Sequence, residues 1–181
     1  MSVLEPIPSL SAGPFVLRPF RSTDTALILE AGLDPLIPLI TTVPAGGNLQ
    51  QAEAFIMRQH ERLTLGQGYS LAIANARDQA IGQIGLWPGQ HERASVGYWV
   101  AASQRRQGAA FQALQALSAW GLGLPHLHRL ELYVEPWNAG SRRTAERAGY
   151  QREGLLRSWQ MVGEERRDME MYSLLKSDLG C

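Results

Sequence analysis

The segment RRQGAA, residues 105–110, combines positive charge with small side chains. Arg105 and Arg106 offer charge-assisted donors, and the glycine and two alanines that end the segment let a ligand approach the backbone. The residues that follow are spaced as a helix, so this turn precedes a helix N-terminus, where free N–H groups and the helix dipole favour anions. The pattern predicts a pyrophosphate site, and an exposed arginine pair at a helix start is the alternative.

Other phosphate-binding motifs are missing from the sequence. A P-loop needs GKS or GKT at the helix start, and a dinucleotide fold needs its glycine fingerprint at the first turn from strand to helix. The segment GLGL, residues 121–124, follows a helix and leads into Pro125, so we interpret it as a helix end.

Metal and thiol chemistry receive no support from the sequence. His126 and His128 have the spacing of ligands on one strand face, but no third ligand occurs at a recognisable spacing. Cys181 is the single cysteine, so we expect no disulfide, no embedded thiol nucleophile and no metal cofactor. No GxSxG segment is present to favour a serine hydrolase.

The composition is that of an ordinary folded domain. The 181 residues are 45% hydrophobic and 19% charged, and 17 basic residues balance 17 acidic ones. With no net charge, the chain has no global field to draw it to nucleic acid or to an anionic membrane, and no apolar run approaches membrane-spanning length. Without a recognisable targeting segment, and with one cysteine, we expect a cytoplasmic protein.

Hydrophobic periodicity and turn residues predict an alternation of strands and helices. A helix is expected after Ser22, Thr23 and Asp24, ending at Gly32, and the segment 34–44 is too interrupted by proline for regular structure. Residues 1–13 are expected to form a flexible arm and 177–181 a tail, around a single domain over 14–176. The other predicted strands cover 14–20, 69–75, 80–88, 94–101, 129–135 and two segments around the turn 162–165, and the other predicted helices cover 50–68, 107–121 and 138–149.

Four segments in the same order resemble the GNAT N-acetyltransferase superfamily. Residues 105–110 match its acyl-CoA pyrophosphate motif, Q or R, two of any residue, G, any residue, then G or A. SVGYWV (95–100) resembles the strand before that motif, HRLELYVEPWNAGS (128–141) the strand and helix start after it, and ERAGYQREGLLR (146–157) the next helix end. Together with LRPFRSTD (17–24), they resemble the branch containing the ribosomal-protein alanine and serine N-acetyltransferases.

This resemblance implies an α/β (α+β) fold with a central mixed, mostly antiparallel sheet, two splayed parallel strands and flanking helices. The co-substrate would be acetyl-CoA or another acyl-CoA, with the pantetheine arm between the splayed strands. Main-chain groups of Trp99 and Val100 would then meet the pantetheine and the thioester oxygen. The resemblance assigns the pyrophosphate to Arg105, Arg106, Gln107, Gly108, Ala109 and Ala110.

Proton transfer is less clearly encoded. Many relatives place a tyrosine four residues before the glycine of the last helix to protonate the leaving thiolate, but Ala145 stands there in this chain. The resemblance makes Ser141 the candidate donor, with Asn138 orienting pantetheine or a water. The alternative is that Asn138 only caps a helix and Ser141 faces solvent.

No general base is evident. Ser95 and Gln160 occupy positions where relatives carry a glutamate. Glu131, Glu153 and Asp168 are further candidates, but we favour strand-face or hairpin ion pairs for them, and water relay remains an alternative.

We therefore expect an acyl-CoA-dependent N-acyltransferase that acts on a primary amine, either a protein N-terminus or a small molecule, by direct attack in a ternary complex. Trp87, Trp159 and the 34–44 segment are candidates to line an acceptor pocket or to accommodate a larger acyl group. A non-catalytic acyl-CoA sensor or scaffold of the same fold and a nucleotide-binding module are the alternatives. The sequence leaves open whether the chain forms a homodimer.

Overall fold

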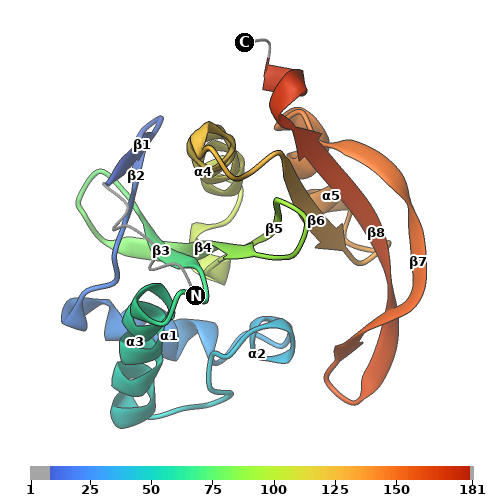
Figure 1. Cartoon of the computed structure of the whole chain (residues 1–181). Helices are drawn as coiled ribbons and strands as arrows, with labels where there is room; N and C mark the ends of the chain where they lie inside the picture. The colour runs from blue at the N-terminus through green and yellow to red at the C-terminus, as the bar shows by residue number, and fades with distance from the viewer. Residues whose placement is uncertain (1–8, 180–181) are drawn as a thin grey trace.

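The computed structural model describes residues 9–179, which form one eight-stranded sheet with helices on both faces (Figure 1). The strand order is β1-β2-β3-β4-β5-β6-β8-β7, and every neighbouring pair is antiparallel except β5 and β6. This mixed sheet confirms the predicted fold class. The strands are β1 (Leu10–Ala12), β2 (Phe15–Arg18), β3 (Tyr69–Ala74), β4 (Ala80–Pro88), β5 (Arg93–Val100), β6 (Arg129–Val134), β7 (Gln151–Val162) and β8 (Glu165–Leu175).

The helices divide between the two faces of the sheet and give the domain two hydrophobic cores (Figure 1). One core joins the helices before β3 to the sheet around Ala72 and Trp99, and the other packs the later helices against the opposite face around Leu86 and Leu130. The helices are α1 (Thr25–Ala31), α2 (Ile37–Ile40), α3 (Leu49–Thr64), α4 (Ala109–Gly123) and α5 (Ala139–Arg147), with 3-10 turns η1 (Ser22–Asp24), η2 (Ala102–Gln104) and η3 (Lys176–Leu179).

The structure differs from the sequence expectation at two short elements. Residues 10–12, assigned to the flexible arm, form β1 and pair with β2. The segment 34–44, expected to be irregular, contains α2 because the Asp34 carboxylate accepts hydrogen bonds from the backbone N–H groups of Leu36 and Ile37. Residues 1–8 of the predicted arm and 180–181 of the predicted tail lie outside the described residues.

Strands β5 and β6 pair over a short distance and then part. Arg93–Ser95 lie opposite Arg129–Glu131, and the remainder of each strand follows its other neighbour. Strand β5 stays paired with β4 as far as Val100, and β6 stays paired with β8 as far as Val134. The two strands therefore leave a gap in the sheet, as the sequence predicts.

The β7–β8 hairpin curves around this gap (Figure 1). A register shift between Leu156 and Gln160 bends β7, and the Ser158 N–H in this irregular stretch donates to Asp168 at 2.7 Å. At the hairpin turn, a Cβ on Gly163 would lie 3.4 Å from a methyl carbon of Leu39 in α2. The hairpin tip and α2 thus meet across the gap. None of the helices within residues 9–179 combines the length and the apolar character needed to cross a bilayer.

Candidate active site

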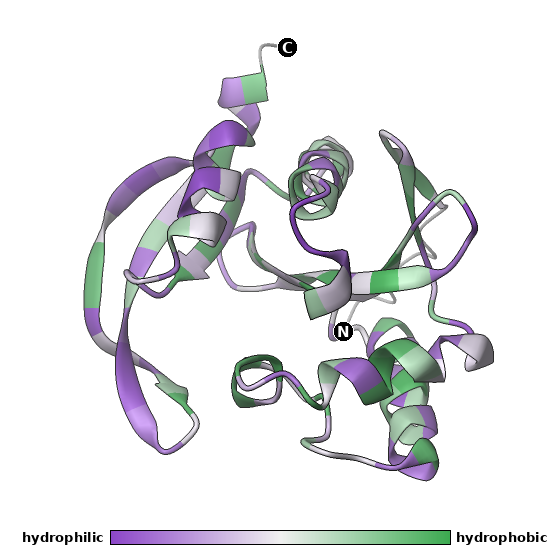
Figure 2. Ribbon diagram, turned by 180° about the vertical axis from the view of Figure 1, so that it is seen from behind, coloured by the Kyte–Doolittle hydropathy of each residue, from purple (hydrophilic) through white to green (hydrophobic). Residues whose placement is uncertain are grey.

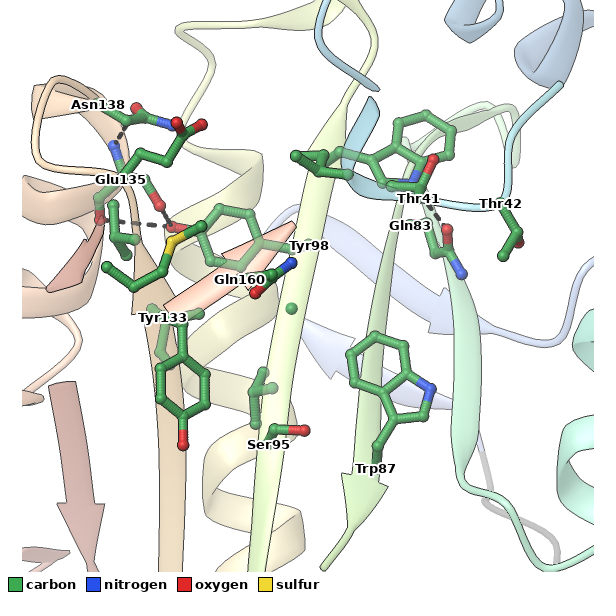
Figure 3. A pocket seen from close by; sticks show the side chains of 18 of the residues that line it. Thr41, Thr42, Gln83, Trp87, Ser95, Tyr98, Tyr133, Glu135, Asn138 and Gln160 are labelled. Atoms are coloured by element: carbon green, nitrogen blue, oxygen red, sulfur yellow. Dashed lines mark hydrogen bonds between the residues drawn. The ribbon is translucent and has the colours of Figure 1, made fainter. Parts of the chain in front are cut away.

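A cavity of about 530 Å³ occupies the gap between β5 and β6. Strand β4 contributes Gln83 and Trp87, and α2 with the residues after it contributes residues 40–42. Figure 3 shows Tyr98 extending from β5 toward the start of α5, with Tyr133 on β6 beside it. The other lining residues are Arg62, Ser95, Val96, Gly97, Trp99, Leu132, Val134, Glu135, Asn138, Ser141, Gln160 and Met169.

The turn before α4 has the geometry of an anion site. Arg106 and Gly108 both have positive φ, of 64° and 81°, and α4 begins without a side-chain cap. The first turn of any helix leaves its N–H groups without intrahelical acceptors, so those of Ala109 and Ala110 are available to a ligand. A Cβ on Gly108 would meet no atom within 4 Å, so there is open space beside this backbone. These features fit a pyrophosphate group.

The predicted arginine pair divides into two different roles. Arg105 donates from Nε to the Val100 carbonyl at 3.0 Å and from Nη2 to Asp34 at 2.6 Å. Its guanidinium is therefore committed to the protein rather than free for phosphate. Arg106 is exposed and has no hydrogen-bond or ion-pair partner among residues 9–179, while Gln107 donates to Gln104 at 3.3 Å. Of the two arginines, Arg106 is the available cation at this turn.

Burial acts to raise the pKa of Asp34, but hydrogen bonds from the Leu36 and Ile37 backbone and from Arg105 outweigh it, so the pKa lies below its usual value. The carboxylate is thus ionised at neutral pH. It connects the turn before α4 with the chain segment that borders the cavity.

Strand β5 presents a free backbone edge to the cavity. The Ala101 N–H donates to Ile81 in β4, and alternate residues of a strand direct their backbone groups to opposite edges. Val100 and Tyr98 therefore face the gap, whereas the main chain of Trp99 faces Gln83 on β4. Of the two residues predicted to offer main-chain groups, Val100 has the required orientation, and Trp99 contributes its side chain.

The Trp99 side chain is fixed by a buried polar network. Its indole N–H donates to Gln83 at 2.7 Å, Gln83 donates to Ser70 at 2.6 Å, and Ser70 donates to Gln59 at 3.0 Å. Gln59 in turn donates to the Phe55 carbonyl in α3. Because every member has a partner, this network gives the wall of the cavity one well-defined arrangement.

Asn138 and Ser141 lie at the start of α5, and Tyr98 reaches them from β5 (Figure 3). The Asn138 side-chain oxygen accepts from the Ser141 N–H at 3.0 Å, so Asn138 caps the helix. The Ser141 hydroxyl lies 2.8 Å from the Tyr98 hydroxyl and lines the cavity rather than facing bulk solvent. Burial raises the pKa of Tyr98, although hydrogen bonds with Ser141 and Thr144 act in the opposite direction.

The three acidic residues considered as bases are engaged elsewhere. Glu131 accepts from Arg129 at 2.8 Å and from the Tyr133 hydroxyl at 2.7 Å. Glu153 forms a two-pronged ion pair with Arg129, and Asp168 caps the Ser158 N–H. None of the three borders the cavity.

Sequence reasoning missed Tyr98, Arg62 and Glu135 as residues of the site. Tyr98 was noted only as one of several aromatic residues near the expected cleft. Glu135 directly follows β6, and Arg62 stands in the last turn of α3. The position of Glu135 at the end of a predicted cleft strand was the one available signal.

Aromatic residues form much of the acceptor side. A Cβ on Gly85 or Gly97 would lie 2.6 Å or 3.2 Å from Trp87 ring atoms, so the Trp87 ring lies across these two glycines. Trp159 stacks on Tyr133, with ring centroids 5.6 Å apart, and so supports the cavity from outside.

Residues 15–151 match the acetyltransferase (GNAT) domain family. The chain therefore belongs to the GNAT acetyltransferase family. It is 27% identical over 165 residues to the uncharacterized N-acetyltransferase p20 of Bacillus licheniformis, covering 90% of this chain and 93% of that protein. It is 28% identical over 127 residues to the probable N-acetyltransferase YjcK of Bacillus subtilis strain 168, covering 68% and 70% of the two chains.

Solved structures share the fold. The RimJ protein of Mycobacterium smegmatis in complex with CoA-disulfide has a TM-score of 0.81 and 24% identity, covering 96% of this chain and 88% of that one. RimL, a ribosomal L7/L12 α-N-protein acetyltransferase in complex with coenzyme A, has a TM-score of 0.78 and 17% identity, covering 93% and 98%. The predicted resemblance to this family is confirmed.

Proposed function

We propose that this protein is a cytoplasmic N-acetyltransferase that transfers acetyl from acetyl-CoA to a primary amine by direct attack in a ternary complex. The parting of β5 and β6 carries the proposal, because it exposes the β5 edge to a cavity that also contains Ser141. A pantetheine arm has the shape to occupy such an edge as an added strand. Related folds that hold coenzyme A support this assignment.

In this proposal the chain holds its co-substrate at two places. The N–H groups of Ala109 and Ala110, with Arg106, bind the pyrophosphate, while the free edge at Tyr98 and Val100 binds pantetheine. Val100 also presents its N–H toward the thioester oxygen, where negative charge develops during attack.

When bound, acetyl-CoA supplies a thioester whose carbonyl carbon bonds to the amine nitrogen as the C–S bond breaks. Ser141 then donates its hydroxyl proton to the departing sulfur, and Tyr98 donates to Ser141 across their 2.8 Å contact. The raised pKa of Tyr98 keeps that hydroxyl protonated at neutral pH. The proton lost by the amine passes to water or to a carboxylate of the cavity.

Thiol release from acetyl-CoA in the presence of an amine panel tests the proposal. We expect release that depends on the amine, together with an increase in melting temperature when coenzyme A is added. Gly108→Asp should abolish this increase, because a carboxylate at a positive-φ position would repel the pyrophosphate and strain the turn.

Gly123→Asp, at the other end of α4, is the matched control, since a Cβ there also meets open space. An unchanged thermal response in Gly108→Asp would refute the pyrophosphate assignment. Binding of coenzyme A without turnover of any amine would instead support a sensor or scaffold.

A further inference from the structure

The cavity contains one cationic and one anionic side chain, and neither has a partner within the described chain. They are Arg62, from the last turn of α3, and Glu135, which directly follows β6. Both are partly buried, and neither takes part in a hydrogen bond or ion pair of its side chain with any of residues 9–179.

Other buried or half-buried charges in this protein are paired. Arg18 meets Asp24 at 2.8 Å, Arg129 meets Glu153 at 2.6 Å, and Arg105 meets Asp34 at 2.6 Å. Removing a charge from water without a partner is costly, so a protein that pairs such groups elsewhere leaves a specific vacancy for a ligand here. Arg62 suits a carboxylate or a phosphate, which a guanidinium binds with two parallel hydrogen bonds.

The two charges lie on different sides of the gap in the sheet. Helix α3 packs against β3, and Arg58, one turn before Arg62, donates to the Thr42 carbonyl at the edge of the cavity. Glu135 belongs to the β6 side, where its carbonyl accepts from the Asn138 N–H. Figure 3 shows Glu135 beside Asn138, with Thr41 and Thr42 on the opposite side. Glu135 is therefore near the proposed reaction centre, and Arg62 is on the far side.

From this arrangement we infer that the acceptor is a primary amine that also carries an anionic group, either carboxylate or phosphate. The amine lies on the Glu135 side, near Ser141, and the anionic group pairs with Arg62. The ring of Trp87 provides an apolar wall between them. A polycation such as a polyamine fits poorly, because the cavity lining offers it a single carboxylate and opposes it with a guanidinium. This inference rests on the proposed function and specifies its acceptor.

Matched acceptors provide the test. Dipeptides with a free C-terminal carboxylate are compared with their C-terminal amides, and phosphoethanolamine with ethanolamine, at saturating acetyl-CoA. Each dipeptide pair shares one kind of amine, so the ratio of kcat/KM values within it reports recognition of the anionic group. We expect the anionic member to be favoured by about ten-fold or more, the range of one charged hydrogen-bonded contact. The favoured pair distinguishes carboxylate from phosphate.

Arg62→Gln should bring that ratio close to one. Arg157→Gln, the same change at an exposed arginine of β7 outside the cavity, should keep the wild-type ratio. Glu135→Gln should lower kcat/KM for both members of a pair and leave their ratio unchanged, because it acts at the amine.

Thermal shifts of the coenzyme A complex with the same compounds provide a readout that does not require turnover. Stabilisation by the anionic member alone, lost in Arg62→Gln, supports the inference even if the rate assay fails. Amine-dependent turnover with equal ratios in wild type and Arg62→Gln would overturn the inference and leave the proposed function standing. Equal thermal shifts from both members of every pair would also overturn it.

Discussion

Tyr98 and Ser141 form a hydroxyl pair at the position where the sequence has no conventional proton donor. Ala145, which replaces the tyrosine of many relatives, is completely buried against the core. Tyr98 approaches the start of α5 from the opposite strand and contacts Ser141 at 2.8 Å. The phenol missing from α5 is thus matched by one from β5.

Removing either hydroxyl should slow the chemical step more than it weakens co-substrate binding. We expect Ser141→Ala to lower kcat by about 100-fold, within the range of general acid catalysis, and Tyr98→Phe by about ten-fold, since Ser141 remains. Steady-state rates give kcat, and the coenzyme A thermal shift gives binding.

Thr64→Ala, which removes an exposed hydroxyl at the end of α3, is the control and should retain the wild-type kcat. Wild-type turnover in Ser141→Ala would return Ser141 to a purely structural place beside the Asn138 cap.

At this scale, sequence reasoning succeeds only where the relevant residues are local. Asn138 and Ser141 are three positions apart at a helix start, a spacing that sequence displays directly. Tyr98 is 43 residues from Ser141, and Asp34 is 71 residues from Arg105. Which charges stay unpaired, as Arg62 does, depends on tertiary neighbours and cannot be read from spacing.

Among the elements, α2 and the turn before α4 are tied together through one ion pair. Arg105 joins the Val100 carbonyl to Asp34, and Asp34 holds the first N–H groups of α2. The co-substrate side and the acceptor side of the cavity therefore share a support. Figure 2 shows that α2 itself is strongly hydrophobic, although Leu39 and Ile40 are 47% and 46% exposed.

Asp34→Asn should loosen α2 and weaken acceptor binding. We expect a loss of about 1–3 kcal/mol in the free energy of unfolding, the range for hydrogen bonds to a charged group, and a raised KM for the amine. Urea unfolding and steady-state kinetics measure the two effects.

Glu30→Gln is the matched control, because Glu30 is an acidic residue of α1 that accepts a single hydrogen bond from the Ser103 N–H. An Asp34→Asn variant with normal stability and normal KM would show that α2 holds its position without this ion pair.

The longer elements are predictable from sequence, whereas α2 and β1 are not. Helix α3 has an Asn48–Gln51 capping box, and α4 and α5 begin at Gly108 and Asn138, which are local signals. Helix α2 lies among three prolines and depends on the Asp34 carboxylate. Strand β1 has three residues and exists through its pairing with β2, so neither element has a periodic pattern of its own.

For the whole molecule, one ion pair holds together the part of the sheet beyond the gap. Arg129 of β6 reaches across β8 to Glu153 of β7, and Ser173 of β8 donates to the same carboxylate at 2.6 Å. Hydrogen bonds from Arg129 and Ser173 lower the pKa of Glu153 from 4.5 to about 2.

This lowered pKa predicts how the ion pair contributes to stability at different pH values. Because the folded-state pKa lies below the unfolded value, the contribution is complete above about pH 4.5 and is lost as the pH falls toward about 2. The melting temperature of Glu153→Gln should therefore lie below that of the wild type at pH 7 and approach it in acid.

Thermal scans of both proteins between pH 2 and pH 7 measure this difference, with Glu164→Gln in the exposed hairpin turn as the control. A difference that stays constant across the whole range would show that the Glu153 carboxylate makes no net electrostatic contribution.

The short contact between β5 and β6 has a mechanical consequence. Three residue pairs join a five-stranded lobe, β1 to β5, to a three-stranded lobe, β6 to β8, and α4 packs against strands of both. The sheet is thus hinged at its centre, with α4 as the brace. A molecule that enters between β5 and β6 contacts both lobes and restores continuity across the hinge, so the rigidity of the whole domain depends on whether that space is filled.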